Sequence, residues 1–238
     1  MKILYPSVIL LTAALAFSCS PKVTMQLASE PLGEYNGEVL LLDDSESIPE
    51  GSEPIATIDV SSRPFTPVKK GTYDIVLKLA RQKVREAGGN VVFIREHQAP
   101  NYHSITHSIK GDVYKLPETA ICAETTVSSH PEYASVWIYR YPLLDEFEYN
   151  VNIDNKWVFW SAPKTMTEVR FYESGKHTVW AYGGRRISVD LDIEIGKDYY
   201  IETSFQEGFH LDHMPYLFEV SAFAGRAACK TMELIEQK

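Results

Sequence analysis

The sequence lacks the common signatures of catalysis and of nucleotide binding. It has no Gly-x-Ser-x-Gly elbow, no Walker A loop, no Gly-x-Gly-x-x-Gly motif and no His-Glu-x-x-His motif. Basic residues are also in the minority, since 23 Lys and Arg stand against 32 Asp and Glu, for a formal net charge of −9. Nucleic acids and anionic lipid headgroups need clustered cations, so neither is an expected partner. We therefore expect a non-enzymatic protein without a cofactor.

Long apolar runs are scarce as well. After the first 18 residues, no stretch approaches the roughly 18 consecutive apolar residues of a membrane-spanning helix. The chain begins with Met1-Lys2, continues with a short apolar run, and reaches Ser18 and then Cys19. This run has the size of a secretory signal, and the small residue before the cysteine resembles a bacterial lipobox. We predict a lipoprotein signal peptide over residues 1–18 and acylation of Cys19, with palmitate among the acyl chains.

The residues after Cys19 predict where the anchored protein lies. Ser20 stands where an aspartate would favour retention in the inner membrane, and no acidic run that would mark surface export follows it. We therefore expect an outer-membrane lipoprotein that faces the periplasm. Residues 19–35 show no sustained periodicity, which predicts a lipidated cysteine followed by a tether.

Only two cysteines remain once Cys19 is acylated. Cys122 and Cys229 are an even pair in an oxidising compartment, where a disulfide closing so long a loop would stabilise the fold. A disulfide-based envelope sensor is then one alternative function. Two separate buried thiols are the other interpretation, and the sequence leaves both open.

The first half of the chain predicts a small α+β module over residues 36–117. Apolar runs at 39–42 and 55–60 predict strands, and apolar residues recur at helical spacing from Tyr73 to Ala87. Thr72 is a fitting N-cap, and Gly88-Gly89 stands where a left-handed helix end needs glycine. Strands are expected at 91–94 and at about 105–116. The helix end Ala87-Gly88-Gly89-Asn90 before an aliphatic strand weakly resembles the YbjQ-like and RcsF-like modules of bacteria. RcsF-like modules use paired cysteines, which are absent here, so no redox role is implied.

The second half predicts a mainly antiparallel β-sandwich with a C-terminal helix over residues 133–238, after a linker at 118–132. Turn signals separate seven short strand candidates, and helical spacing returns from Val220 onward, with a loop expected at 210–213. Four motifs resemble a PEGA-like, Ig-like domain family of unknown function found in uncharacterised bacterial lipoproteins. They are the strand at 134–140, the hairpin at 151–156, the turn at 173–179 and the strand at 196–201. The resemblance implies a fold and a compartment, and no chemistry.

Aromatic residues on two strands supply the candidate binding surface. Trp137, Tyr139 and Tyr141 alternate along one strand, and Trp157 and Phe159 alternate along another. Exposed aromatic stripes are typical binding surfaces, here for an envelope protein or a glycan. In the alternative interpretation, the first module or the C-terminal helix covers these faces.

Three histidines supply the competing hypothesis. His97, His103 and His107 flank a turn at Pro100-Asn101, so His97 can meet one of the others across a hairpin. A metal-binding or enzymatic envelope protein would use this region. Histidines at the surface beside a turn are the simpler interpretation, and we expect no metal.

Overall fold

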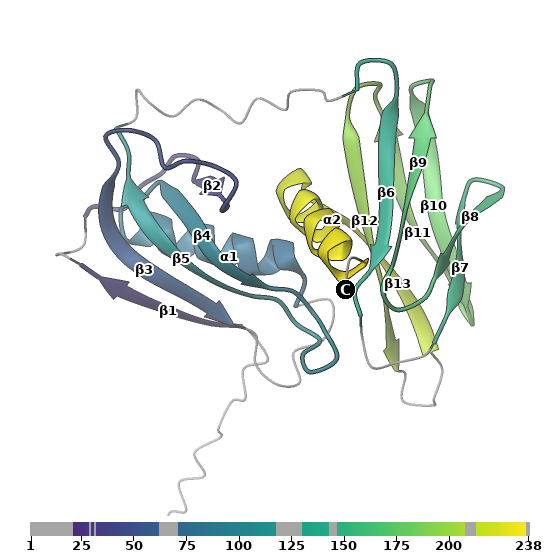
Figure 1. Cartoon of the computed structure of the whole chain (residues 1–238), viewed down its shortest axis with the longest axis horizontal. Coiled ribbons are helices and arrows are strands. Elements are labelled where there is room, and N and C mark those ends of the chain that lie inside the picture. The colour runs from purple at the N-terminus through teal and green to yellow at the C-terminus, as the bar shows by residue number, and fades with distance from the viewer. Residues whose placement is uncertain are drawn as a thin grey trace, which may run out of the picture.

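A computed structural model of the chain describes residues 21–28, 30, 32–61, 71–117, 130–142, 147–207 and 213–236. Within these residues the protein is mainly β, with three sheets, one helix in the N-terminal half and one helix near the C-terminus (Figure 1). The predicted signal peptide, Cys19 and Cys122 lie outside the described residues.

The N-terminal half is one five-stranded mixed sheet with a helix packed on it. The sheet has the order β1-β3-β5-β4-β2, in which β2 runs parallel to β4 and the other pairs are antiparallel. The strands are β1 (Lys22–Leu27), β2 (Leu40–Leu42), β3 (Glu53–Ser61), β4 (Val91–Gln98) and β5 (Ser108–Lys115). Helix α1 (Tyr73–Glu86) buries the apolar face that its spacing predicts, through Tyr73, Val76, Leu77, Ala80 and Val84.

Local sequence signals set the two ends of α1. Asp74 lies in the first turn, where a negative charge favours the helix dipole. Thr72 is the N-cap residue, as predicted, but its side chain makes no capping hydrogen bond. At the other end Gly88 has a φ of 84°, and the Cβ of Leu32 and the carbonyl oxygen of Gly33 lie too close to it for any Cβ. The glycine predicted to end the helix is therefore also a packing site.

Part of the predicted tether over residues 19–35 belongs to the five-stranded sheet. Residues 22–27 form β1, which pairs with β3 along its whole length. Val23 and Met25 pack against the core, and further on the Tyr35 N–H donates to the carbonyl of Arg85. The prediction failed here because an edge strand needs only two inward apolar residues, too few to show a sustained period.

The C-terminal half contains two four-stranded sheets. One has the order β11-β10-β7-β8 and is antiparallel, while the other has the order β13-β12-β6-β9 and is mixed, since β6 and β12 run parallel. The first consists of β7 (Tyr149–Ile153), β8 (Lys156–Ser161), β10 (Gly175–Gly183) and β11 (Arg185–Ile193). The second consists of β6 (Ala134–Arg140), β9 (Thr165–Phe171), β12 (Asp198–Glu207) and β13 (His213–Val220).

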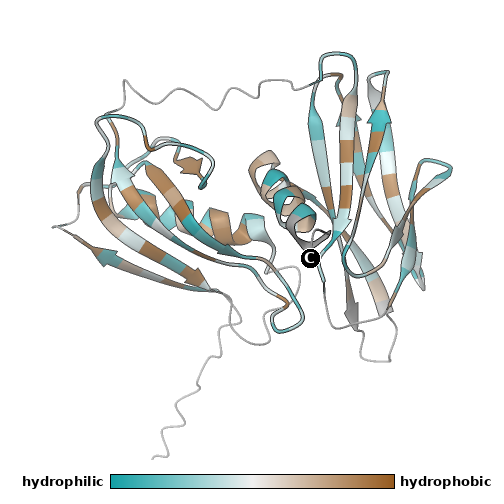
Figure 2. Cartoon of the chain, in the orientation of Figure 1, coloured by the Kyte–Doolittle hydropathy of each residue, from teal (hydrophilic) through white to brown (hydrophobic). Residues whose placement is uncertain are grey.

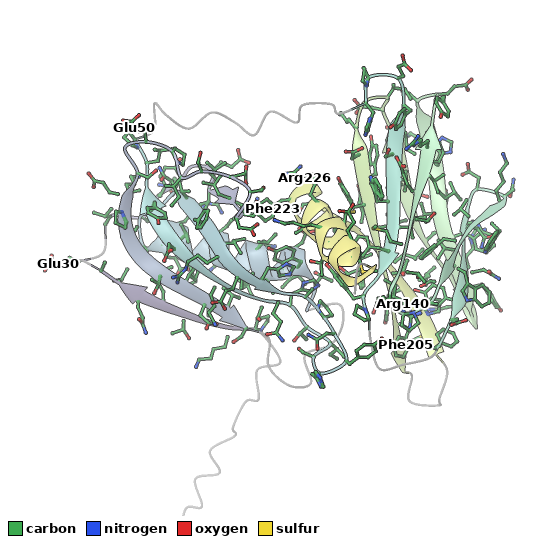
Figure 3. All side chains as sticks on the ribbon, in the orientation of Figure 1. Glu30, Glu50, Arg140, Phe205, Phe223 and Arg226 are labelled. Carbon is green, nitrogen blue, oxygen red and sulfur yellow. The ribbon has the colours of Figure 1, made fainter. Side chains whose placement is uncertain are left out.

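The two four-stranded sheets share one hydrophobic core. Alternate residues from both meet in it, among them Val136 and Ile201 from one sheet and Val151 and Val179 from the other. Figure 2 shows the corresponding alternation of apolar and polar residues along the strands. At one end of this core the fully buried Arg140 donates to the carbonyls of Phe147 (2.6 Å) and Ser161 (3.0 Å), near Phe205 (Figure 3).

Strand β13 was not predicted from the sequence. It pairs with β12 from His213 to Val220 and carries Pro215 opposite Phe205. Proline cannot donate a ladder hydrogen bond and therefore suits an edge strand, which is the position that β13 occupies. The predicted C-terminal helix is confirmed as α2 (Ala222–Glu236).

Helix α2 lies between the five-stranded sheet and the pair of four-stranded sheets (Figure 1). Its Phe223 and Met232 belong to a core that also contains side chains of α1 and β3 and the aromatic rings of β6. At its start the N–H of Ser221 donates to Asp74 in the first turn of α1 (2.8 Å). Along the helix Lys230 forms an ion pair with Asp44. The two halves are thus joined by one continuous hydrophobic core.

Candidate functional site

The aromatic stripe of β6 is covered. Tyr139 and Tyr141 are 1% and 2% exposed, and Trp137 is half-buried against the same core. Tyr200 on the neighbouring strand and Phe223 on α2 share that core. This half of the predicted binding surface is therefore the internal junction between the two halves of the chain, which is the alternative that the sequence left open.

The aromatic residues of β8 do not alternate as predicted. A β-bulge in the β7–β8 pairing places Phe159 opposite Val151 but Trp157 opposite Asn152. As a result Phe159 points into the core and is 6% exposed, whereas Trp157 is 61% exposed. Trp160 lies outside the core as well, at 46% exposure. The bulge therefore puts two tryptophans of one strand on the outer face of the sheet.

Further aromatic residues join them from β10. Trp180 pairs with Asn152 across the β7–β10 ladder, and Tyr182, two residues along the strand, is 63% exposed. These side chains line a groove of about 720 Å³ on the outer face of the β11-β10-β7-β8 sheet. We call it the aromatic groove; its residues are Phe147, Glu148, Tyr149, Asn150, Asn152, Trp157, Trp160, Trp180, Tyr182 and Gly183.

The groove has two aromatic walls and an amide floor. The walls are the aromatic side chains of β8 and β10, and the floor is Asn150 and Asn152 on β7, which lies between those strands. Two steps between neighbouring strands separate the backbones of the walls by about 10 Å. The aromatic side chains of β8 and β10 therefore flank the asparagine floor on both sides.

Hydrogen bonds hold two of the indole rings in place. The Trp160 Nε1–H donates to Oε2 of Glu148, and the Trp180 Nε1–H donates to the carbonyl of Asp154, both at 2.6 Å. The Arg186 guanidinium lies 4.4 Å from the Trp180 ring centroid, a distance typical of a cation–π contact. The rings are thus oriented before any ligand arrives, which lowers the entropic cost of binding.

The predicted contact between histidines across the hairpin is confirmed for one pair. His97 on β4 and His107 just before β5 come together across the hairpin, with Nε2 of His97 2.9 Å from Nδ1 of His107. The ring of Tyr73 stacks on His97 at 3.8 Å between centroids. His103 is exposed in the loop, where its backbone N–H donates to Asn101. Within the residues that the structure describes, no three His, Cys, Asp or Glu side chains form a group that could hold a metal ion.

The histidine pair extends into a buried polar junction with Glu202, which the sequence did not indicate. His107 Nε2 lies 3.9 Å from Glu202 Oε2 on β12, and both side chains are almost fully buried. Burial lowers the pKa of His107 well below its usual value, and the neighbouring His97 lowers it further. Burial, with a smaller contribution from Asp74, raises the pKa of Glu202 to about 8. The two shifts each favour the neutral form of the group, which disfavours an ion pair between these two atoms.

Cys229 lies partly buried on α2, where burial raises the pKa of its thiol to about 12. A thiol with such a pKa is a poor nucleophile at neutral pH. Because Cys122 lies outside the described residues, the disulfide remains a prediction.

In comparisons with known proteins, no family model, no curated protein and no solved structure matches this chain. Among the described residues, neither helix is long and apolar enough to cross a membrane. The function therefore has to be argued from the geometry of the site.

Proposed function

We propose that this protein is a lipid-anchored cell-envelope protein with a non-enzymatic binding role, and that its ligand binds in the aromatic groove. The observation that carries the proposal is the exposure of Trp157, Trp160 and Tyr182 beside one another on one sheet face. Monomeric proteins rarely expose large aromatic side chains together unless the surface binds something. The two indole rings held by hydrogen bonds also favour a site that is organised in advance.

The rest of the proposal rests on the sequence. Acylation of Cys19 would anchor the chain in the outer membrane on its periplasmic side, and residues 1–18 would be the signal peptide. The division into a module at 36–117, a linker at 118–132 and a domain at 133–238 belongs to the same proposal. The two face-to-face sheets are compatible with a PEGA-like, Ig-like sandwich, and the helix and sheet of the first half with a YbjQ-like or RcsF-like module.

A photo-cross-linking experiment tests the groove. We expect a benzophenone amino acid in place of Asn150, on the groove floor, to cross-link envelope material in intact cells. The same amino acid in place of Tyr172, which is 69% exposed but lies outside the groove, serves as the control. Cross-linking at position 150 should disappear when Trp157→Ala is added. Equal cross-linking at both positions would contradict a binding role for the groove.

The anchor has its own test. We expect wild-type protein to incorporate labelled palmitate and to partition into the detergent phase, and Cys19→Ser to do neither. The physical reason is that several acyl chains together contribute about 0.8 kcal/mol per buried methylene to membrane binding. A Cys229→Ser variant, which keeps Cys19, should behave like wild type. Labelling that persists in Cys19→Ser would refute the predicted lipidation site.

A further inference from the structure

The aromatic lining of the groove favours a ligand built from rings. Aromatic side chains of β8 and β10 line the groove on either side of β7, so a ligand in the groove has aromatic rings on both sides. Trp157 and Trp180 are both opposite Asn152 in their respective ladders and so lie in one row across the sheet. Trp160 is opposite Asn150, which places it in the next row along the strands. A chain running along β7 would therefore meet aromatic side chains at successive positions about 7 Å apart, two residues of a strand.

The polar groups of the groove suit hydroxyl groups better than charges. Each asparagine side chain of the floor offers both donors and an acceptor. Among the described residues, Glu148 is the one charged side chain that lines the groove, and its Oε2 already accepts the Trp160 indole N–H. The Arg186 guanidinium lies against Trp180 from the neighbouring strand β11 and is not part of the lining. The groove thus offers little compensation for a charged ligand.

We infer that the aromatic groove binds a neutral glycan chain, an inference that rests on the proposed binding function. Pyranose rings present C–H faces that stack on aromatic rings, and their hydroxyl groups both donate and accept hydrogen bonds. Two successive aromatic rows suit a ligand with more than one ring, and the asparagine floor suits the hydroxyl groups at the ring edges. The acidic balance of the whole chain also disfavours an anionic polysaccharide.

A proline-rich peptide is the main competing ligand for an aromatic groove. Such a peptide exposes backbone carbonyls that need N–H donors from the groove. Here the indole N–H groups of Trp160 and Trp180 are already donated to Glu148 and to the Asp154 carbonyl. The groups left for a ligand are the ring faces, the asparagine amides, the Trp157 indole N–H and the Tyr182 hydroxyl, a mixed set of donors and acceptors that suits hydroxyl groups better than a row of carbonyls.

Isothermal titration with defined probes tests the inference. The full-length protein in detergent would be titrated with neutral hexasaccharides of glucose, mannose, xylose and N-acetylglucosamine, with polygalacturonate, and with a proline-rich decapeptide. We expect at least one neutral hexasaccharide to bind, with a Kd that is unchanged by added salt. Trp157→Ala and Trp180→Ala should each weaken that binding about tenfold, and Tyr172→Ala should not.

The remaining outcomes of this titration would contradict the inference that the groove binds a neutral glycan. Hexasaccharide binding that survives Trp157→Ala and Trp180→Ala unchanged would place the ligand elsewhere. Trp157-dependent binding of only the decapeptide or polygalacturonate would overturn the inference while leaving a binding role for the groove. If no probe binds while cross-linking at position 150 persists, the glycan inference is also overturned and the groove keeps a binding role. Because Trp157 is largely exposed, its replacement is not expected to unfold the chain, and an unchanged thermal midpoint verifies this.

Discussion

Replacing Gly225 with alanine is expected to destabilise the protein by about 3 kcal/mol. Gly225 lies in α2 where the helix crosses β12, and a Cβ at this position would lie 1.9 Å from Cγ of Tyr200 and 2.5 Å from its Cβ. Rotating the tyrosine ring cannot relieve the clash, since the Cβ of Tyr200 is fixed to the backbone of a central strand. The helix would have to move away from the sheet and would weaken the core that joins the two halves. The clash outweighs the about 1 kcal/mol that alanine gains over glycine in a helix.

Urea unfolding of Gly225→Ala measures this effect, and the Tyr200→Ala background is its control. In that background the contacts with Cγ and Cδ1 are gone and only the 2.5 Å approach to the retained Cβ of residue 200 is left, so the same substitution should cost clearly less than the about 3 kcal/mol expected in the wild-type background. Glu233→Ala, at an exposed position of the same helix, should change the free energy of unfolding by less than about 0.5 kcal/mol. If Gly225→Ala were as stable as wild type, α2 would not pack on β12 as described.

Glu202→Gln is expected to make the protein more stable than wild type in alkaline solution. The native pKa of Glu202, about 8, lies above the usual value of 4.5 for a glutamate, so the native state binds the proton more tightly than the unfolded state. The stability that this proton contributes is complete below pH 4.5 and is lost as the pH rises toward 8. Between pH 6.5 and 8 the loss is about 2 kcal/mol, at about 1.4 kcal/mol per pH unit. Glutamine, which mimics the protonated acid, removes this loss.

The two histidines of the junction act in the opposite direction. Burial lowers the native pKa of His97 to about 4, below its usual 6.5, and His107 is shifted the same way. Their contribution is complete above pH 6.5 and is lost as the pH falls toward 4. Below pH 6.5 the two histidines make the protein less stable as the pH falls, and they outweigh the single glutamate, which makes it more stable. Above pH 6.5 only the glutamate changes the stability, which falls as the pH rises. Wild-type stability should therefore be greatest near pH 6.5.

Urea unfolding at pH 5.5, 6.5 and 8.0 would measure how the free energy of unfolding changes with pH on either side of the maximum. In Glu202→Gln the decrease above pH 6.5 should disappear, while the decrease below pH 6.5 should steepen because the opposing glutamate is gone. Glu219→Gln, on the exposed side of the neighbouring strand β13, should keep the wild-type profile. A Glu202→Gln protein that is less stable than wild type at pH 8 would mean that the native carboxylate is ionised and well solvated.

Local signals in the sequence were sufficient for much of the secondary structure. Apolar residues at helical spacing predicted α1, and the glycine predicted to end the helix is Gly88, which has a left-handed backbone conformation. Turn residues likewise separated the strands from β6 to β12. The edge strands were harder, because β1 has few inward apolar residues and β13 contains Pro215, and an edge strand needs pairing on one side only.

The candidate site depended on contacts that the sequence does not encode locally. By itself the sequence determined that the strands carry aromatic residues and that alternation gives each strand two faces. Only the tertiary structure decided that α2 and the first half cover the β6 face, and that the bulge in β8 turns Trp157 outward beside Trp160. It also decided that His97 meets His107 and that Glu202 lies next to them. Alternation depends on neighbouring residues of one strand, whereas burial and register depend on partners far along the chain.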